Sequence, residues 1–186
     1  QVVALEHRHD ALFFDNGTSD HRLLPQAVLH RYYRHALRNS FASNTVRYGS
    51  EGTGYHLRCA LAEMLRNNRG LTVTAENICL TQGTQMSLFL SASLLLKPGD
   101  VVLVERLSYP PAWEIFRKLG AKLVTVDIDD EGCRTDQVER LCREHKVRMI
   151  YLTPHHQFPT TVSLHAARRQ HLLALAALHD LCIIEE

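Results

Sequence analysis

The stretch KPGDVVLVERLSYPPAWEIFRKLGAKLVTVDI, residues 97–128, decides the fold. Two short runs rich in valine and leucine, DVVLVE at 100–105 and AKLVTVDI at 121–128, lie on either side of a pattern of helical length. A proline–glycine pair precedes the first run, and Gly120 ends the helical pattern. A wholly apolar strand followed by a helix and a second strand is typical of a buried parallel sheet.

The same alternation continues on both sides of this stretch, with turn residues between the elements. The predicted strands are 76–82, 100–105, 121–128, 148–154 and 181–186, and the predicted helices are 85–96, 110–119, 135–146 and 166–179. Right-handed crossovers place helices on both faces of such a sheet. The sequence therefore predicts an α/β fold with a largely parallel sheet.

The first 70 residues have a different pattern. They contain one helical stretch with Pro25 near its start and a second that Gly70 ends. The glycine-rich connection between them, RYGSEGTGY at 47–55, is either a flexible linker or a loop that approaches a ligand or a neighbouring subunit. We therefore divide the chain into an N-terminal segment, 1–70, and a sheet-containing part, 71–186.

Composition excludes several classes of protein. The 186 residues are 45 % hydrophobic and carry a formal net charge of +1, which argues against a polybasic nucleic-acid binder or an acidic disordered tail. No apolar run is long enough to predict a membrane span. Five cysteines without a C-x-x-C pair predict a reducing, cytoplasmic location, and twelve scattered histidines predict no metal site.

Three polar segments follow predicted strands: TQGTQM at 81–86, ERLSYPPAW at 105–113 and TPHHQFPTT at 153–161. Ligands of open α/β sheets bind beyond the carboxyl ends of the strands. Gly83 allows close approach of the backbone at a helix N-terminus, where free amides favour an anion. Tyr109 offers a ring to a flat ligand. Together the segments suit a flat, phosphorylated, aromatic cofactor.

Each of these features also has a purely structural interpretation. Thr84 is a possible N-cap of the helix that follows it, and Tyr109 a core or surface packing residue. His155 and His156 are either structural or a general base, without an accompanying nucleophile. The acidic run DIDDEG at 127–132 is predicted to be a solvated turn whose carboxylates have no partners.

Seven ordered stretches resemble the fold-type I, pyridoxal-phosphate-dependent aminotransferases of class I/II, and together they cover about residues 13–186. They are FDNGTSDHRLLP, RYGSEGTGYHLRCALAEML followed by GL, ICLTQGTQMSL, LKPGDVVLVERLSYPPA, FRKLGAKLVTVDIDDEG, IYLTPHHQFPTT, and RRQHLLALA with the terminal IIEE. The TPHHQFPT turn resembles most closely the aminotransferase-like domain of MocR-type, GntR-family transcriptional regulators.

The resemblance implies pyridoxal 5'-phosphate as the cofactor and assigns roles to individual residues. Gly83, Thr84 and Gln85 match the loop that binds the cofactor phosphate. Tyr109 matches the aromatic residue that stacks on the pyridine ring. The implied fold is the first part of the family's large, cofactor-binding domain, with residues 1–70 contributing to the dimer contact and the small domain.

Further matches lie on other segments. Gln157 lies near the family's polar contact to the ring hydroxyl, and Tyr48 matches a tyrosine that reaches the phosphate of the partner subunit, which implies a homodimer. Glu186, or the residue after it, stands where a carboxylate holds the ring nitrogen. Two positions depart from the pattern: Thr161 replaces the glycine of the P-T-G turn, and Gly54 is one position from its usual place.

None of the four lysines in the chain follows the serine-rich strand that precedes the family's Schiff-base lysine. We therefore expect that lysine downstream of Glu186, a fold that is incomplete at the C-terminus, and no catalytic residue and no activity in this chain alone.

Two functions stay open. The chain is the effector-sensing part of a MocR-type regulator that recognises the cofactor or an amino compound, or it is a fragment of a working aminotransferase that acts on an amino acid and a 2-oxo acid. A regulator would contact DNA only through a winged-helix domain, and this chain contains no such domain.

Overall fold

The computed structural model describes residues 20–42 and 54–186. Contacts divide the chain into two units, Gln1–Cys79 and Leu80–Glu186. We describe each unit by itself, and the predicted division at residue 70 stays a prediction. Tyr48 and most of the glycine-rich connection lie outside the described residues. Among the residues described, no helix is long and apolar enough to cross a membrane.

The described residues of the first unit form two α-helices and two short 3-10 helices. They are η1 (His21–Leu23), α1 (Gln26–Ala42), α2 (Tyr55–Arg69) and η2 (Ala75–Asn77). Pro25 immediately precedes α1. Gly70 ends α2 in the left-handed conformation, with φ 66°. Its backbone N–H donates to the carbonyl of Arg66, and the N–H of Leu71 donates to the carbonyl of Leu65. Both predicted helices of this part are confirmed.

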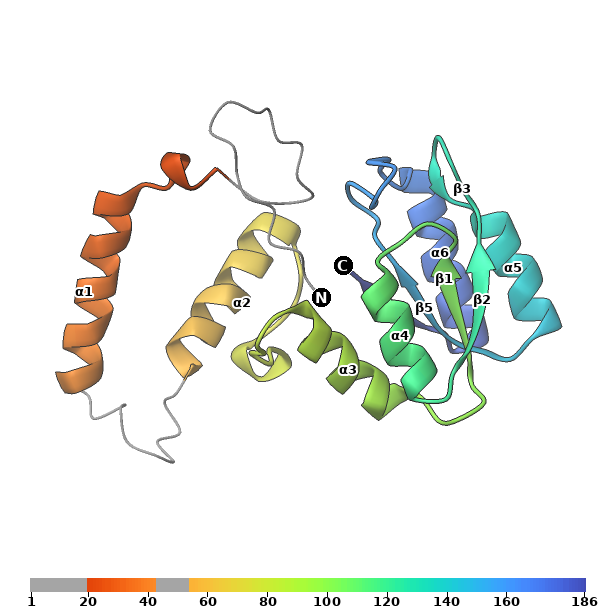
Figure 1. Ribbon diagram of the computed structural model, residues 1–186, viewed down its shortest axis with the longest axis horizontal. Coiled ribbons are helices and arrows are strands. Elements are labelled where there is room, and N and C mark those ends of the chain that lie inside the picture. The colour runs from red at the N-terminus through yellow and green to blue at the C-terminus, as the bar shows by residue number, and fades with distance from the viewer. Residues whose placement is uncertain (1–19, 43–53) are drawn as a thin grey trace, which may run out of the picture. The chain divides into compact units, whose positions relative to one another are not determined.

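A four-stranded parallel sheet forms the centre of the second unit (Figure 1). Its strands are β1 (Val101–Glu105), β2 (Lys122–Val126), β5 (Val147–Leu152) and β6 (Cys182–Glu185), in the order β2-β1-β5-β6. Each neighbouring pair is parallel. Four of the five predicted strands are therefore confirmed within two residues at each end.

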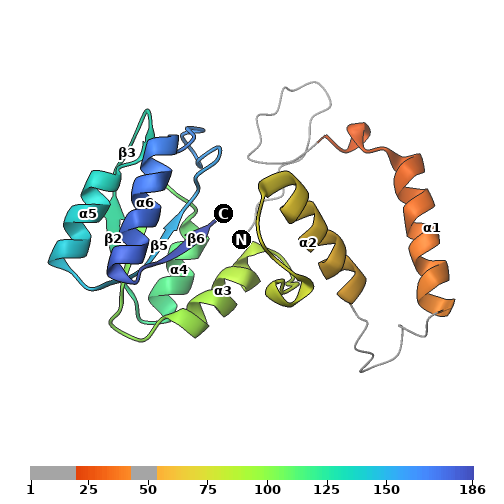
Figure 2. The same cartoon turned by 180° about the vertical axis from the view of Figure 1, so that it is seen from behind.

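Helices cover both faces of this sheet, as predicted (Figures 1 and 2). One face packs against α3 (Thr84–Leu95) and α4 (Pro110–Lys118), and the other against α5 (Thr135–Glu144) and α6 (Ala166–His179). Successive strand residues alternate between two separate cores: Val102 and Val104 join the core under α3 and α4, whereas Leu103 joins the core under α5 and α6. Burial on both faces explains why these strands are apolar throughout.

The predicted strand at 76–82 is wrong. Ala75–Asn77 form the 3-10 helix η2, because the Asn77 side chain accepts hydrogen bonds from the backbone N–H and the hydroxyl of Thr74 and so stabilises a turn. Ile78 has extended backbone angles, but its N–H bonds to the carbonyl of Ala75. Among the described strands none pairs with residues 78–82, and an extended segment becomes a strand only when it pairs with a neighbour.

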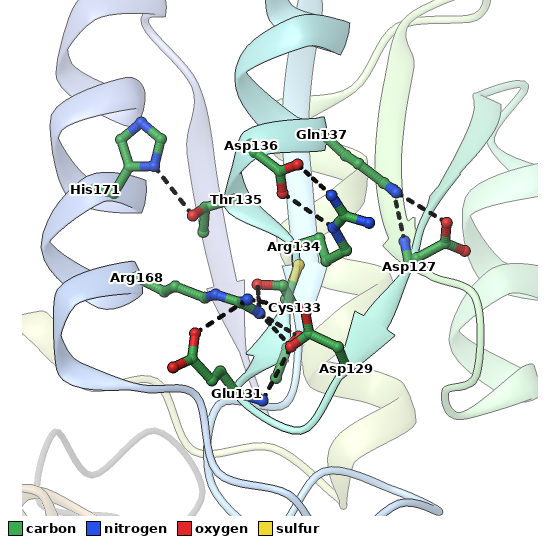
Figure 3. A network of polar contacts seen from close by, with 11 residues as sticks. Asp127, Asp129, Glu131, Cys133, Arg134, Thr135, Asp136, Gln137, Arg168 and His171 are labelled. Carbon is green, nitrogen blue, oxygen red and sulfur yellow. Dashed lines mark hydrogen bonds and ion pairs between the residues drawn. The ribbon is translucent and has the colours of Figure 1, made fainter.

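The acidic run after β2 is not the unpartnered turn that we predicted. It forms a hairpin of β3 (Ile128–Asp129) and β4 (Gly132–Cys133), and Arg168 of α6 points into it (Figure 3). The Arg168 guanidinium donates to both carboxylate oxygens of Asp129, at 2.6 and 2.8 Å, and to the carbonyl of Gly132 at 2.9 Å. Glu131 lies 3.2 Å from the same group. Sequence analysis missed this contact because Arg168 lies 39 residues from Asp129.

Replacing Arg168 should therefore destabilise the second unit. We expect Arg168→Leu to lower the free energy of unfolding by about 2 kcal/mol at pH 7, since it leaves Asp129 and two backbone carbonyls without their donor. Urea denaturation measures this. The matched control is Arg117→Leu, which removes an exposed ion pair with Glu114 and should cost less than about 0.5 kcal/mol.

The ion pair between Arg168 and Asp129 also predicts that the free energy of unfolding depends on pH. Arg168 lowers the pKa of Asp129 from 3.8 to about 2. Because the folded-state pKa lies below the unfolded value, the stability from ionised Asp129 is present above pH 4 and is lost as the pH falls toward 2. The difference in stability between the wild type and Arg168→Leu should therefore shrink over this interval. A difference that stays constant from pH 7 to pH 2 would contradict this assignment.

Candidate functional site

The topology of the sheet points to one place for a ligand, at the carboxyl ends of its strands; we call this the carboxyl edge of the sheet. The chain leaves β1 through α4 to reach β2 on one side, and it leaves β5 through α6 to reach β6 on the other side. Since α4 and α6 cover opposite faces, the order of the strands reverses between β1 and β5. Ligands of open α/β sheets bind outside the carboxyl ends of the strands at such a point. The segments after β1 and β5 are the ones that contain Tyr109 and Gln157.

The N-terminus of α3 has the features of an anion site. Gly83 is the N-cap, with φ 84° and ψ 169°, and among the described residues no side chain caps the helix. The cap is thus Gly83 and not Thr84, which is the first residue of the helix. The first amides of a helix have no partner within it, and they attract an anion together with the helix dipole. Gly83, Thr84 and Gln85 are all exposed.

Tyr109 lies next to this helix N-terminus. It is the N-cap residue of α4, and its ring packs against the core under α3 and α4 while part of it stays accessible. The side-chain amide of Gln85 donates to the Tyr109 hydroxyl at 3.2 Å. The structure therefore brings together the loop residues and the aromatic residue that the sequence assigned to one ligand, across 24 positions of the chain.

Gln157 lies at the same edge but is only 1 % exposed. Its side-chain NH₂ donates to Glu105 at 3.3 Å and to the carbonyl of Leu107. Its side-chain oxygen accepts from the hydroxyl and the N–H of Thr160, at 2.6 and 3.1 Å. The amide is thus fully bonded within the chain, and the predicted contact with a cofactor hydroxyl stays a prediction.

Glu186 follows β6 and accepts a hydrogen bond from the Tyr151 hydroxyl. Tyr151 is buried, and burial together with this carboxylate raises the pKa of its phenol well above the usual value. Ser108, which precedes Tyr109 in the sequence, is also buried, and its hydroxyl interacts with the Tyr151 phenol.

The turn after β5 has a backbone conformation that favours glycine. Thr161, which replaces glycine in the P-T-G pattern, has φ 62°, in the left-handed region that glycine tolerates and a β-branched residue disfavours. His155, one of the two histidines considered as a general base, contacts the guanidinium of Arg169, with 3.0 Å between Nε2 and the arginine nitrogen.

Sequence analysis missed Glu105, a buried carboxylate at the end of β1. Its position at the end of an apolar strand was the available signal.

The fold defines an α/β protein with a parallel sheet, and the candidate site lies at the carboxyl ends of its strands. The chain belongs to the aminotransferase class I and II family, whose model matches residues 17–184. It is 28 % identical to aromatic-amino-acid aminotransferase 1 of Thermococcus litoralis, over all of this chain and 46 % of that protein. It is 31 % identical to the probable rhizopine catabolism regulatory protein MocR of Rhizobium meliloti, over 75 % of this chain and 29 % of that protein.

Among solved structures, the chain is similar to the alpha-aminoadipate aminotransferase LysN of Thermus thermophilus, in complex with N-(5'-phosphopyridoxyl)-L-leucine. The TM-score is 0.77 at 28 % identity, over 92 % of this chain and 42 % of that one. The chain therefore spans less than half the length of the relatives named here, and its fold is part of the fold-type I large domain.

Proposed function

We propose that this chain is the part of an aminotransferase-like protein that binds the phosphate and the ring of pyridoxal 5'-phosphate. The observation that carries the proposal is the juxtaposition of Tyr109 with the N-terminus of α3, which no described side chain caps, joined by the Gln85–Tyr109 hydrogen bond. The cofactor in the LysN complex supports it.

The residues of the chain have distinct tasks in this proposal. The backbone amides at Thr84 and Gln85, with the Thr84 hydroxyl, bind the phosphate. Tyr109 stacks on the ring, and Gln85 orients Tyr109. Glu186 or the next residue holds the proton on the ring nitrogen, with Tyr151 as its hydrogen-bond donor. Tyr48 reaches the phosphate of the second subunit of a homodimer. When bound, the cofactor supplies an electron sink for reactions at the carbon that carries an amino group.

For the whole protein, we propose the effector-sensing part of a cytoplasmic MocR-type regulator, with an amino compound as effector and a winged-helix domain as the part that contacts DNA. The TPHHQFPT turn and the similarity to MocR favour this function. The alternative is an aminotransferase, which the match to the Thermococcus litoralis enzyme over the full chain favours. Two assays of the complete protein distinguish them: cofactor-dependent DNA retardation supports the regulator, and amino transfer to a 2-oxo acid without DNA binding supports the enzyme.

Substitution of Tyr109 tests the site itself. We expect Tyr109→Ala to weaken binding of pyridoxal phosphate by about 1 kcal/mol, or about fivefold, because one stacking contact is lost. Tyr109→Phe keeps the ring and should stay within about twofold of the wild type. Quenching of protein fluorescence by the cofactor measures the dissociation constants.

A second substitution tests the phosphate loop independently. Gly83→Val forces a β-branched residue into φ 84°, although the space around this glycine is open. Displacing the first amides of α3 should weaken binding of the cofactor. Unchanged cofactor binding in both Tyr109→Ala and Gly83→Val would refute the proposed site.

A further inference from the structure

The two loops at the candidate site are joined by a buried carboxylate and a buried amide. Glu105 ends β1, and Gln157 lies in the loop after β5; each is 1 % exposed. The Gln157 amide nitrogen donates to Glu105 at 3.3 Å, and the N–H of Thr153 donates to the same carboxylate oxygen at 3.1 Å. Glu105 is thus bonded to both the start and the middle of the loop after β5.

Gln157 also holds the loop that carries Tyr109. Its NH₂ group donates to the carbonyl of Leu107, two residues before Tyr109. On the other side, the backbone N–H of Arg106 donates to Val126 at the end of β2, at 2.8 Å. The short segment 106–109 is therefore held by β2 at its start and by Gln157 in its middle, just before Tyr109.

Because Gln157 and Glu105 are buried, loss of the hydrogen bonds from Gln157 to Glu105 and to the carbonyl of Leu107 costs free energy. Burial raises the pKa of Glu105, and the donors from Thr153 and Gln157 oppose this shift. A buried carboxylate without donors, or a buried carbonyl such as that of Leu107 without one, costs free energy. The conformation in which Gln157 bonds to both groups is thereby favoured over conformations in which the Tyr109 loop has moved away.

We propose that Gln157, anchored by Glu105, is a positioning residue that sets the place of the Tyr109 ring for stacking on the cofactor. This inference rests on the proposed function and differs from a direct contact of Gln157 with the cofactor. If Gln157 acts only through Tyr109, its contribution to cofactor binding cannot exceed that of the Tyr109 ring. The two contributions must also be non-additive.

A double-mutant cycle in the complete protein tests this. We expect Gln157→Glu, which keeps the shape but removes the amide donors, to weaken pyridoxal phosphate binding about threefold, and Tyr109→Ala about fivefold. The double variant should bind no more weakly than Tyr109→Ala alone. Amide hydrogen exchange of 107–109 in the cofactor-free protein should become faster in Gln157→Glu.

Two further variants control for changes in folding. Gln157→Met removes the donors without adding a charge, and it replaces Gln157→Glu in the cycle if the latter folds poorly. Thr135→Val removes a 3.0 Å hydrogen bond between the buried Thr135 hydroxyl and His171 on the other face of the sheet. It should leave cofactor binding unchanged despite a loss of stability.

Each outcome is decisive. Non-additive losses with faster exchange of 107–109 support the positioning role. Additive losses in the double variant overturn it and indicate that Gln157 acts on the cofactor independently of Tyr109. Wild-type affinity in both Gln157 variants also overturns it. Absence of cofactor binding in the wild-type protein overturns the proposed function, and the inference with it.

Discussion

Borohydride reduction of this chain in the presence of pyridoxal phosphate should give no stoichiometric adduct on any single lysine. The family's covalent chemistry requires a lysine amine at the cofactor aldehyde, because that linkage admits the amino group of the substrate. The chain contains four lysines, Lys97, Lys118, Lys122 and Lys146, and all of them are exposed.

The structure places these lysines at the amino ends of the strands, whereas the candidate site lies at the carboxyl ends. Lys97 precedes β1 and Lys146 precedes β5, whereas Lys122 is the first residue of β2. Lys118 ends α4, the helix that starts beside Tyr109 and leads to β2. A strand of five residues spans about 17 Å, so none of the four amines reaches a ring stacked on Tyr109.

Intact mass followed by peptide mapping decides this prediction. Exposed lysines react with an aldehyde slowly and at low occupancy, so the expected pattern is partial labelling spread over the four positions. The same chain treated without borohydride is the control for reversible binding. A single site labelled to completion would show that the chemistry lies at the opposite edge of the sheet.

The features that sequence predicted best are those that neighbouring residues determine. Gly70 ends α2 and Pro110 begins α4 because each residue acts on its own backbone. The failure at 76–82 has the opposite cause. Whether an apolar segment is a strand depends on a partner strand elsewhere, and the local hydrogen bonds between Thr74 and Asn77 favoured a turn. The partner of Asp129 was missed because no local pattern connects it with Arg168.

The residues of the candidate site show the same difference between local and distant determinants. Tyr109 follows the confirmed strand β1, so sequence alone placed it at the carboxyl end of the sheet. Gly83 was placed there from a predicted strand that does not form, and only the structure shows that it lies at the N-terminus of α3 beside Tyr109. The state of Gln157 does not follow from its neighbours, since its partners Glu105 and Leu107 are 52 and 50 positions away. The resemblance assigned Gln157 to a cofactor contact, which stays a prediction, but no local pattern showed that its side chain is buried between two loops.

The substitution with the largest expected effect on the free energy of unfolding lies in the core beneath Tyr109. Phe116 of α4 is fully buried, and its ring meets that of Tyr151 edge to face, with 5.6 Å between centroids. Tyr109 packs against the same cluster. Phe116→Ala should lower the free energy of unfolding by about 4 kcal/mol, because it removes a buried ring and leaves a cavity that the two flanking layers cannot fill.

Phe89 of α3 provides the matched control, because its side chain is 49 % exposed. In the same chain, Phe89→Ala should cost less than about 1 kcal/mol. Urea denaturation of both variants gives the comparison, and equal losses would show that the core under α3 and α4 is not packed as described. Since Tyr109 rests on the cluster that Phe116 completes, the Phe116 cavity should also weaken cofactor binding at temperatures where the variant is still folded. Phe89→Ala should leave cofactor binding unchanged.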